Sequence, residues 1–164
     1  MSSTNYYWPL STIENGKTWG STIGKAYGTI KSTSGVKNRA NAALKFVGPG
    51  SYIDAGSFHM KCLTFPDICA HSGLSISFMA SFGSVAANWK ETVNILDSLG
   101  SERNSTGVAV YVQNKKLWFV VSTVSSYWTV DIDIQGDEVW RHYAMDWGLI
   151  HIAIYLNGRQ VKSR

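Results

Sequence analysis

Short apolar runs separated by turn residues recur along most of the chain. Two segments, 75–78 and 126–135, alternate apolar and polar side chains with a period of two, which is typical of strands with one buried face. Other runs are short and mostly apolar, at 43–47, 108–112, 117–121 and 151–156. Gly-Pro-Gly at 48–50 and Asn-Gly at 157–158 follow two of these runs and favour tight turns. The pattern predicts an all-β fold, a two-sheet antiparallel jelly-roll sandwich.

The segment 86–99 departs from this pattern. Four of its apolar residues, with spacings of 4, 3 and 3, fit one face of a helix: Trp89, Val93, Leu96 and Leu99. The β-branched residues of the same segment favour a strand, so both structures stay open. No internal repeat or linker divides the chain, and 164 residues suit one domain. The sequence therefore predicts a single domain over residues 1–164.

Charged residues make up only 16% of the chain, below the roughly 25% of an average soluble domain. The polar surface must therefore come from Ser, Thr, Asn and Gly, which is common in secreted β proteins. The net charge of +4 is mild, and the Lys and Arg residues are scattered along the sequence. This scatter argues against nucleic acid as a partner and fits weak attraction to anionic glycans better.

No segment has the composition of a signal peptide or a membrane span. Residues 1–30 are polar and contain no apolar core of a signal sequence. No apolar run reaches 18 residues. An extracellular location therefore implies that the chain is a mature fragment or an excised domain.

Two cysteines, Cys62 and Cys69, flank a segment that contains a Pro-Asp pair. Their spacing does not fit a C-x-x-C redox pair, and no second pair completes a zinc site. The Pro-Asp turn favours a disulfide that closes a small loop in an extracellular protein. Two free thiols in a cytosolic protein are the alternative. The triplet 104–106 is a sequon, which predicts N-glycosylation at Asn104.

Several loose motifs follow one another in order: Ala43-Leu44-Lys45-Phe46, Gly50-Ser51-Tyr52-Ile53-Asp54, Cys62 to Cys69, Gly73-Leu74-Ser75-Ile76-Ser77-Phe78, Gly107-Val108-Ala109-Val110-Tyr111 and Ile154-Tyr155-Leu156-Asn157-Gly158. In order and spacing they resemble the concanavalin A-like jelly roll, in particular the laminin-G-like and pentraxin-like domains of animal extracellular proteins. The resemblance implies a non-catalytic recognition module that binds a glycan or a protein partner in adhesion or matrix assembly. That family continues with more strand beyond residue 158, which implies a piece of a longer protein and leaves truncation at the C-terminus open.

The superfamily also includes retaining glucanases, whose catalytic strand the segment 131–135 resembles. A retaining mechanism needs a nucleophile and an acid/base about 5–5.5 Å apart. Gln135 stands at one of these two positions and cannot exchange a proton. Asp131, at the other position, is one methylene shorter than the family's Glu. The alternation instead predicts a strand whose Asp131 and Asp133 face solvent while the apolar residues between them face the core.

Candidate binding residues come from the resemblance and from side-chain chemistry. Many domains of this family bind Ca²⁺ at the rim of the sandwich, which implies Asp54 and Asp97, together with Asp146, as candidate ligands. A tryptophan face suits the apolar face of a sugar ring. Tyr127 and Trp128 are neighbours on a predicted strand, so one of them points outward. The candidate ligand-binding residues are Trp128, Asp131 and Asp133.

Two alternatives to a recognition module stay open. The first is a structural spacer without a ligand in a multidomain ectodomain. The second is a glucanase-like glycoside hydrolase, which Gln135 disfavours. Binding that depends on Trp128 would support recognition over the spacer, and hydrolysis that Asp131→Asn abolishes would support the enzyme.

Overall fold

The computed structural model describes residues 5–83, 92–100 and 105–164. The chain divides into two compact units, which we call the N-terminal unit (residues 1–57) and the C-terminal unit (residues 58–164). The described residues form three sheets, and all of these are antiparallel, as the pattern predicts. The prediction of a single domain over residues 1–164 stays a prediction. None of the helices in the described ranges has the length and apolar character of a membrane span.

The described residues of the N-terminal unit contain one three-stranded sheet, of which the sequence predicted the start of the third strand at 43–47. Its strands are β1 (Lys17–Thr18), β2 (Gly24–Thr33) and β3 (Ala43–Asp54), in the order β1-β2-β3, and a 3-10 helix, η1 (Val36–Asn38), connects β2 to β3. The tight turn expected at Gly-Pro-Gly 48–50 is wrong, because these residues lie within the third strand. The register shifts at Gly28, which has a φ of 72°. A Cβ atom there would lie 2.6 Å from the Gly50 carbonyl oxygen, so this bulge requires glycine.

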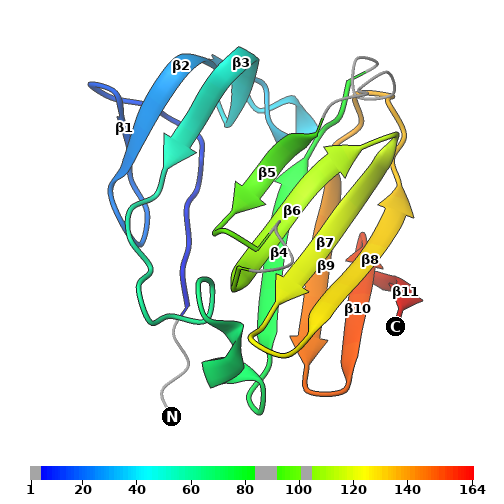
Figure 1. Ribbon diagram of the computed structural model, residues 1–164. Coiled ribbons are helices and arrows are strands. Elements are labelled where there is room, and N and C mark those ends of the chain that lie inside the picture. The colour runs from blue at the N-terminus through cyan, green and yellow to red at the C-terminus, as the bar shows by residue number, and fades with distance from the viewer. Residues whose placement is uncertain (1–4, 84–91, 101–104) are drawn as a thin grey trace. The chain divides into compact units, whose positions relative to one another are not determined.

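The C-terminal unit is a sandwich of two four-stranded sheets (Figure 1). The first sheet has the order β5-β6-β7-β8 and consists of β5 (Val93–Asp97), β6 (Gly107–Gln113), β7 (Lys116–Ser122) and β8 (Tyr127–Asp133). The second has the order β11-β10-β9-β4 and consists of β4 (Leu74–Ala80), β9 (Arg141–Gly148), β10 (His151–Leu156) and β11 (Arg159–Ser163). The sandwich prediction is confirmed. The helical alternative for 86–99 is wrong for 93–97, which form β5, and residues 84–91 lie outside the described ranges.

The core of the sandwich lies between these two sheets. Alternate residues of β6, β7, β9 and β10 point into it, among them Phe119, Leu117 and Tyr143, all at most 2% exposed. On β8 and directly after it, the apolar residues at 130, 132 and 134 belong to this core or pack against it, as the alternation predicts. Burial of these apolar faces is the main stabilising contribution of the C-terminal unit.

Two of the turns between strands have positive φ at both of their residues. Asn157-Gly158 joins β10 to β11 with φ values of 51° and 79°, and Asn114-Lys115 joins β6 to β7 with φ values of 52° and 65°. Both residues of a type I′ turn need positive φ, which Asn and Gly adopt at low cost. The predicted Asn-Gly hairpin is therefore confirmed, and β11 pairs with β10 beyond it.

Candidate functional site

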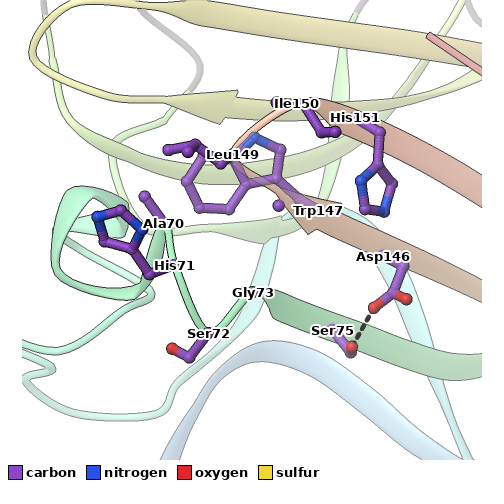
Figure 2. Close-up of a pocket in the computed structure, with 11 residues that line it drawn as sticks. Ala70, His71, Ser72, Gly73, Ser75, Asp146, Trp147, Leu149, Ile150 and His151 are labelled. Carbon is purple, nitrogen blue, oxygen red and sulfur yellow. Dashed lines mark hydrogen bonds between the residues drawn. The ribbon is translucent and has the colours of Figure 1, made fainter.

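A hollow of about 440 Å³ opens at one end of the sandwich (Figure 2). Three segments line it: the loop 70–73 with Ser75 at the start of β4, the end of β9 at 146–148, and the turn that leads into His151 of β10. The volume falls within the range of small-molecule sites, which begins at about 300 Å³. All of these residues belong to the C-terminal unit.

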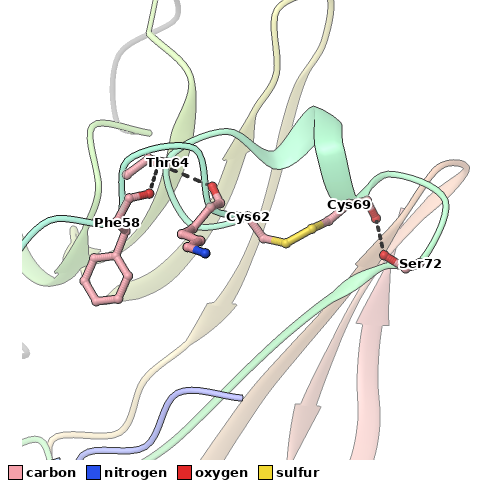
Figure 3. The surroundings of a disulfide bond; sticks show 6 residues. Phe58, Cys62, Thr64, Cys69 and Ser72 are labelled. Atoms are coloured by element: carbon pink, nitrogen blue, oxygen red, sulfur yellow. Dashed lines mark hydrogen bonds between the residues drawn. A yellow bond between two sulfur atoms is a disulfide. The ribbon is translucent and has the colours of Figure 1, made fainter. Parts of the chain in front are cut away.

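A disulfide holds the loop that forms the first wall. Cys62 is joined to Cys69, the last residue of the 3-10 helix η2 (Pro66–Cys69), as the Pro-Asp turn predicts (Figure 3). The carbonyl oxygen of Cys69 accepts hydrogen bonds from the backbone N–H of Gly73, at 2.7 Å, and from the Ser72 hydroxyl, at 3.4 Å. The crosslink therefore fixes the position from which the wall of the hollow starts.

The same loop is also tied to the ends of the β5-β6-β7-β8 sheet. The Thr106 hydroxyl donates to the Thr64 carbonyl at 3.0 Å, and the Val124 N–H donates to the Asp67 carboxylate at 3.1 Å. The Ser98 hydroxyl donates to the carbonyl of Leu63, a side chain that is 8% exposed. These bonds come from three separate segments of the chain. The loop is therefore held in place by residues outside its own sequence as well as by the disulfide.

The second wall of the hollow is built by paired strands. Ser75 on β4 lies directly opposite Asp146 on β9, and its hydroxyl donates to Asp146 Oδ1. The next residue, Trp147, turns toward the core and is only 3% exposed. Figure 2 shows Asp146 and His151 on one side of the hollow and His71 and Ser72 on the other.

The turn at the rim of the hollow differs from the turns at 114–115 and 157–158, whose residues have positive φ. Leu149 and Ile150 join β9 to β10, and neither has positive φ. Their side chains are 57% and 83% exposed. Because neither position needs positive φ, this turn does not require Asn or Gly. The two exposed aliphatic side chains therefore fit the turn backbone and give the hollow an apolar rim.

The hollow presents several polar groups that the described residues leave available. The imidazoles of His71 and His151 form no hydrogen bond with any described residue, and Asp146 uses one carboxylate oxygen for Ser75. Each imidazole can donate or accept, and the carboxylate accepts. An apolar rim with a few donors and acceptors suits a ligand that carries both C–H faces and hydroxyl groups.

The face of β8 that carries Asp131 is a separate surface. Asp131 accepts hydrogen bonds from Lys116 Nζ at 2.7 Å and from Lys162 Nζ at 3.1 Å, and its side chain is 17% exposed. The bond to Lys116, more than that to Lys162, lowers the pKa of Asp131. Asp133 is exposed and forms no ion pair within the described part of the chain. Asp133 therefore faces solvent, as predicted, whereas Asp131 is largely covered and bridges β7 and β11.

An aromatic pair lies beside this ion-pair network. Tyr111 on β6 and Trp118 on β7 stack at 6.2 Å between ring centroids, and Lys116 Nζ lies 5.9 Å from the Trp118 ring. Burial raises the pKa of Tyr111. Trp128, the predicted sugar-stacking residue, is partly buried and packs against the core. Its role in ligand binding stays a prediction.

A second ion pair lies beyond the end of β8. Arg141 donates to Asp137 Oδ2 at 2.5 Å and to Gln135 Oε1 at 2.9 Å. Its guanidinium lowers the pKa of Asp137 from 3.8 to about 2. Gln135, at the position where a glucanase has a carboxylate, is thus an acceptor in a bond with a cation.

The predicted calcium ligands Asp54 and Asp97 lie in different units. Asp54 accepts from the N–H of Gly56 at 2.9 Å, in the N-terminal unit. Asp97 accepts from the Leu99 N–H at 2.8 Å and from the Asn94 amide at 3.1 Å, in the C-terminal unit. Within the described ranges no three His, Cys, Asp or Glu residues group as a metal site. Asn104, the predicted glycosylation site, lies outside the described residues.

Comparison with known proteins finds similarity of fold. No protein-family model matches the chain, and no curated protein matches its sequence. Among solved structures, a point mutant of HCR/D superposes with a TM-score of 0.67 over 97% of this chain, at 13% identity. The receptor binding domain of botulinum neurotoxin C/D mosaic serotype and the botulinum neurotoxin serotype D binding domain give TM-scores of 0.63 and 0.62 over 86%, each at 14% identity.

This chain covers 39% of the first of these structures and 34% of the other two, so it spans well under half of their length. At such low identity the likeness shows the fold alone. The β-sandwich expected from the concanavalin A-like resemblance is confirmed, whereas its laminin-G-like or pentraxin-like branch stays a prediction.

The sequence analysis did not identify the hollow. His71 and His151 are 80 residues apart, and no metal-ligand or catalytic spacing links them.

Proposed function

We propose that the chain is a non-catalytic extracellular recognition module and that its hollow binds a glycan. The observation that carries the proposal is the pairing of an exposed aliphatic rim, Leu149 and Ile150, with the available imidazoles of His71 and His151 around one cavity. Sugar hydroxyls can bond to the imidazoles, and the C–H face of the ring can rest on the rim.

The chemistry of the hollow supports binding over hydrolysis. Asp146 is the one carboxylate among its lining residues, and glycoside hydrolysis uses a pair. Asp146 is bonded to Ser75 directly, and neither imidazole bonds to that serine in the described chain, so a Ser-His-Asp relay is not assembled.

The disulfide and the solved structures of similar fold also support this proposal. A disulfide persists in oxidising compartments, which supports an extracellular site of action. Two of the structures that share the fold are named as binding domains, one of them as a receptor binding domain. The laminin-G-like or pentraxin-like assignment, with a role in adhesion, belongs to the same proposal.

A glycan array of neutral and acidic saccharides tests the proposal, with hits measured by calorimetry in calcium and in chelator. The double variant His71→Ala, His151→Ala is expected to weaken binding about ten-fold, because each lost hydrogen bond costs about 0.5–1.5 kcal/mol. His142→Ala is the matched control, since it changes the same residue type at the opposite end of β9.

Two results would overturn this assignment. Equal binding by the double variant and the wild type would move the ligand away from the hollow. A folded chain that binds nothing on the array would favour the structural spacer.

A further inference from the structure

The net charge of the protein is confined to one of its two units. Residues 1–57 contain six Lys and Arg against two acidic residues, Glu14 and Asp54, which is a net charge of +4. Residues 58–164 contain nine basic and nine acidic residues and are neutral. In the linear sequence the cations look scattered, but four of them belong to one sheet.

Lysines face lysines across the strands of this sheet. Lys31 on β2 lies directly opposite Lys45 on β3, and Lys25 on β2 lies directly opposite Lys17 on β1. Like charges at directly opposed positions repel each other and destabilise a sheet. Asp54 is the other cross-strand neighbour of Lys25, but none of these four lysines forms an ion pair with a described residue.

An aromatic pair lies between the two lysine pairs along β2. Tyr27 and Tyr52 occupy opposed positions on β2 and β3 and stack at 4.7 Å between ring centroids, 41% and 51% exposed. Lys31 lies six positions after Lys25, a span of roughly 20 Å along a strand. In order along β2 the sheet thus carries a lysine pair, a tyrosine pair, the bulge at Gly28 and a second lysine pair. We call these three pairs the lysine–tyrosine ladder: Lys17, Lys25, Tyr27, Tyr52, Lys31 and Lys45.

We infer that the lysine–tyrosine ladder binds a sulfated polysaccharide laid along β2. A linear polyanion relieves the repulsion within both lysine pairs at once, and ammonium groups bind sulfate without strict geometry. The tyrosine pair offers a surface for a sugar ring between the two charged contacts. This site is separate from the hollow and does not depend on the function proposed for it.

Two other polyanions fit the ladder less well. An anionic membrane is usually met by aromatic residues that project at a tip, whereas Tyr27 and Tyr52 lie within strands at the middle of the ladder. Nucleic acid is disfavoured because the disulfide indicates an oxidising compartment. Both are included in the test as competing ligands.

The test measures binding of the full chain to a heparin octasaccharide by calorimetry at several salt concentrations. The variant Lys31→Ala, Lys45→Ala is expected to bind about ten-fold more weakly or worse. Lys37→Ala, Arg39→Ala is the matched control, since it removes the same charge from the same unit outside the ladder. Tyr27→Ala is expected to weaken binding, and Tyr27→Phe to retain it.

A further variant separates loss of binding from loss of folding. Lys31→Glu places a carboxylate opposite Lys45, so it is expected to raise the melting temperature while binding of the octasaccharide is lost. Three outcomes would overturn the inference: no heparin binding, equal loss in the ladder and control variants, or tighter binding of anionic vesicles or single-stranded DNA through the same lysines. Binding to the neutral-glycan hits of the hollow is expected to be the same in all ladder variants.

Discussion

The two units of this protein differ in how far their apolar side chains are buried and in how their charges are balanced. In the C-terminal unit two sheets bury their apolar faces against each other, and nine cations balance nine acidic groups. In the described part of the N-terminal unit Ala43 is the one hydrophobic residue that is buried, while Tyr27, Phe46 and Tyr52 are all more than 40% exposed. The N-terminal unit carries a net charge of +4.

The contrast indicates where stability and where recognition reside. Ion pairs in the described chain all lie in the C-terminal unit, for example Lys116 with Asp131. Opposed lysines such as Lys31 and Lys45 lower stability without a partner. Such lysine pairs next to exposed aromatic side chains do not stabilise the sheet. Binding of an external ligand explains their presence better.

The largest expected difference between the units concerns matched phenylalanine truncations. Phe119→Ala removes a fully buried ring of the sandwich core and is expected to cost about 3–5 kcal/mol of unfolding free energy. Phe46→Ala removes a ring that is 45% exposed and is expected to cost less than about 1 kcal/mol. Urea unfolding followed by tryptophan fluorescence measures both, and equal losses would contradict the contrast.

The disulfide is expected to have the next largest effect, and only on one unit. The double variant Cys62→Ser, Cys69→Ser is expected to lose about 2–3 kcal/mol, because the closed loop restricts the unfolded chain. Glycan binding in the hollow is expected to fall with it, since its wall starts at Cys69. Octasaccharide binding to the ladder serves as the control. Its loss in the same variant would show that the two units are not independent.

The smallest expected effect is on acid stability. The pKa of Asp137 is lowered to about 2 when the protein is folded, chiefly by its bond to Arg141. A lowered carboxyl pKa stabilises the fold above the unfolded value near 4, and this stabilisation is lost as the pH falls through about 2. Melting temperatures between pH 6 and 2 are expected to fall less in Asp137→Asn than in wild type. Asp133→Asn, which removes an exposed carboxylate without an ion pair, is expected to follow the wild-type curve.

Local patterns predicted much of the fold but little of either site. The hairpin at Asn157-Gly158 was predictable because positive φ is a property of two adjacent residues. The alternation around Asp131 also placed its neighbours correctly. Strand β2 was missed because its apolar residues are few. Strand β9 was also missed, although its buried residues Tyr143, Met145 and Trp147 recur with a period of two.

The sequence by itself determined the all-β class and the polar face of the strand at Asp131, and it favoured the disulfide. Strand period, turn chemistry and short loop closure all act over a few neighbouring residues. Only the tertiary structure decided that His71 and His151 share one hollow and that Lys31 opposes Lys45. Both results depend on strand register and pairing between distant segments. A shift of one residue would turn these side chains to the other face, so no local pattern in the chain could reveal them.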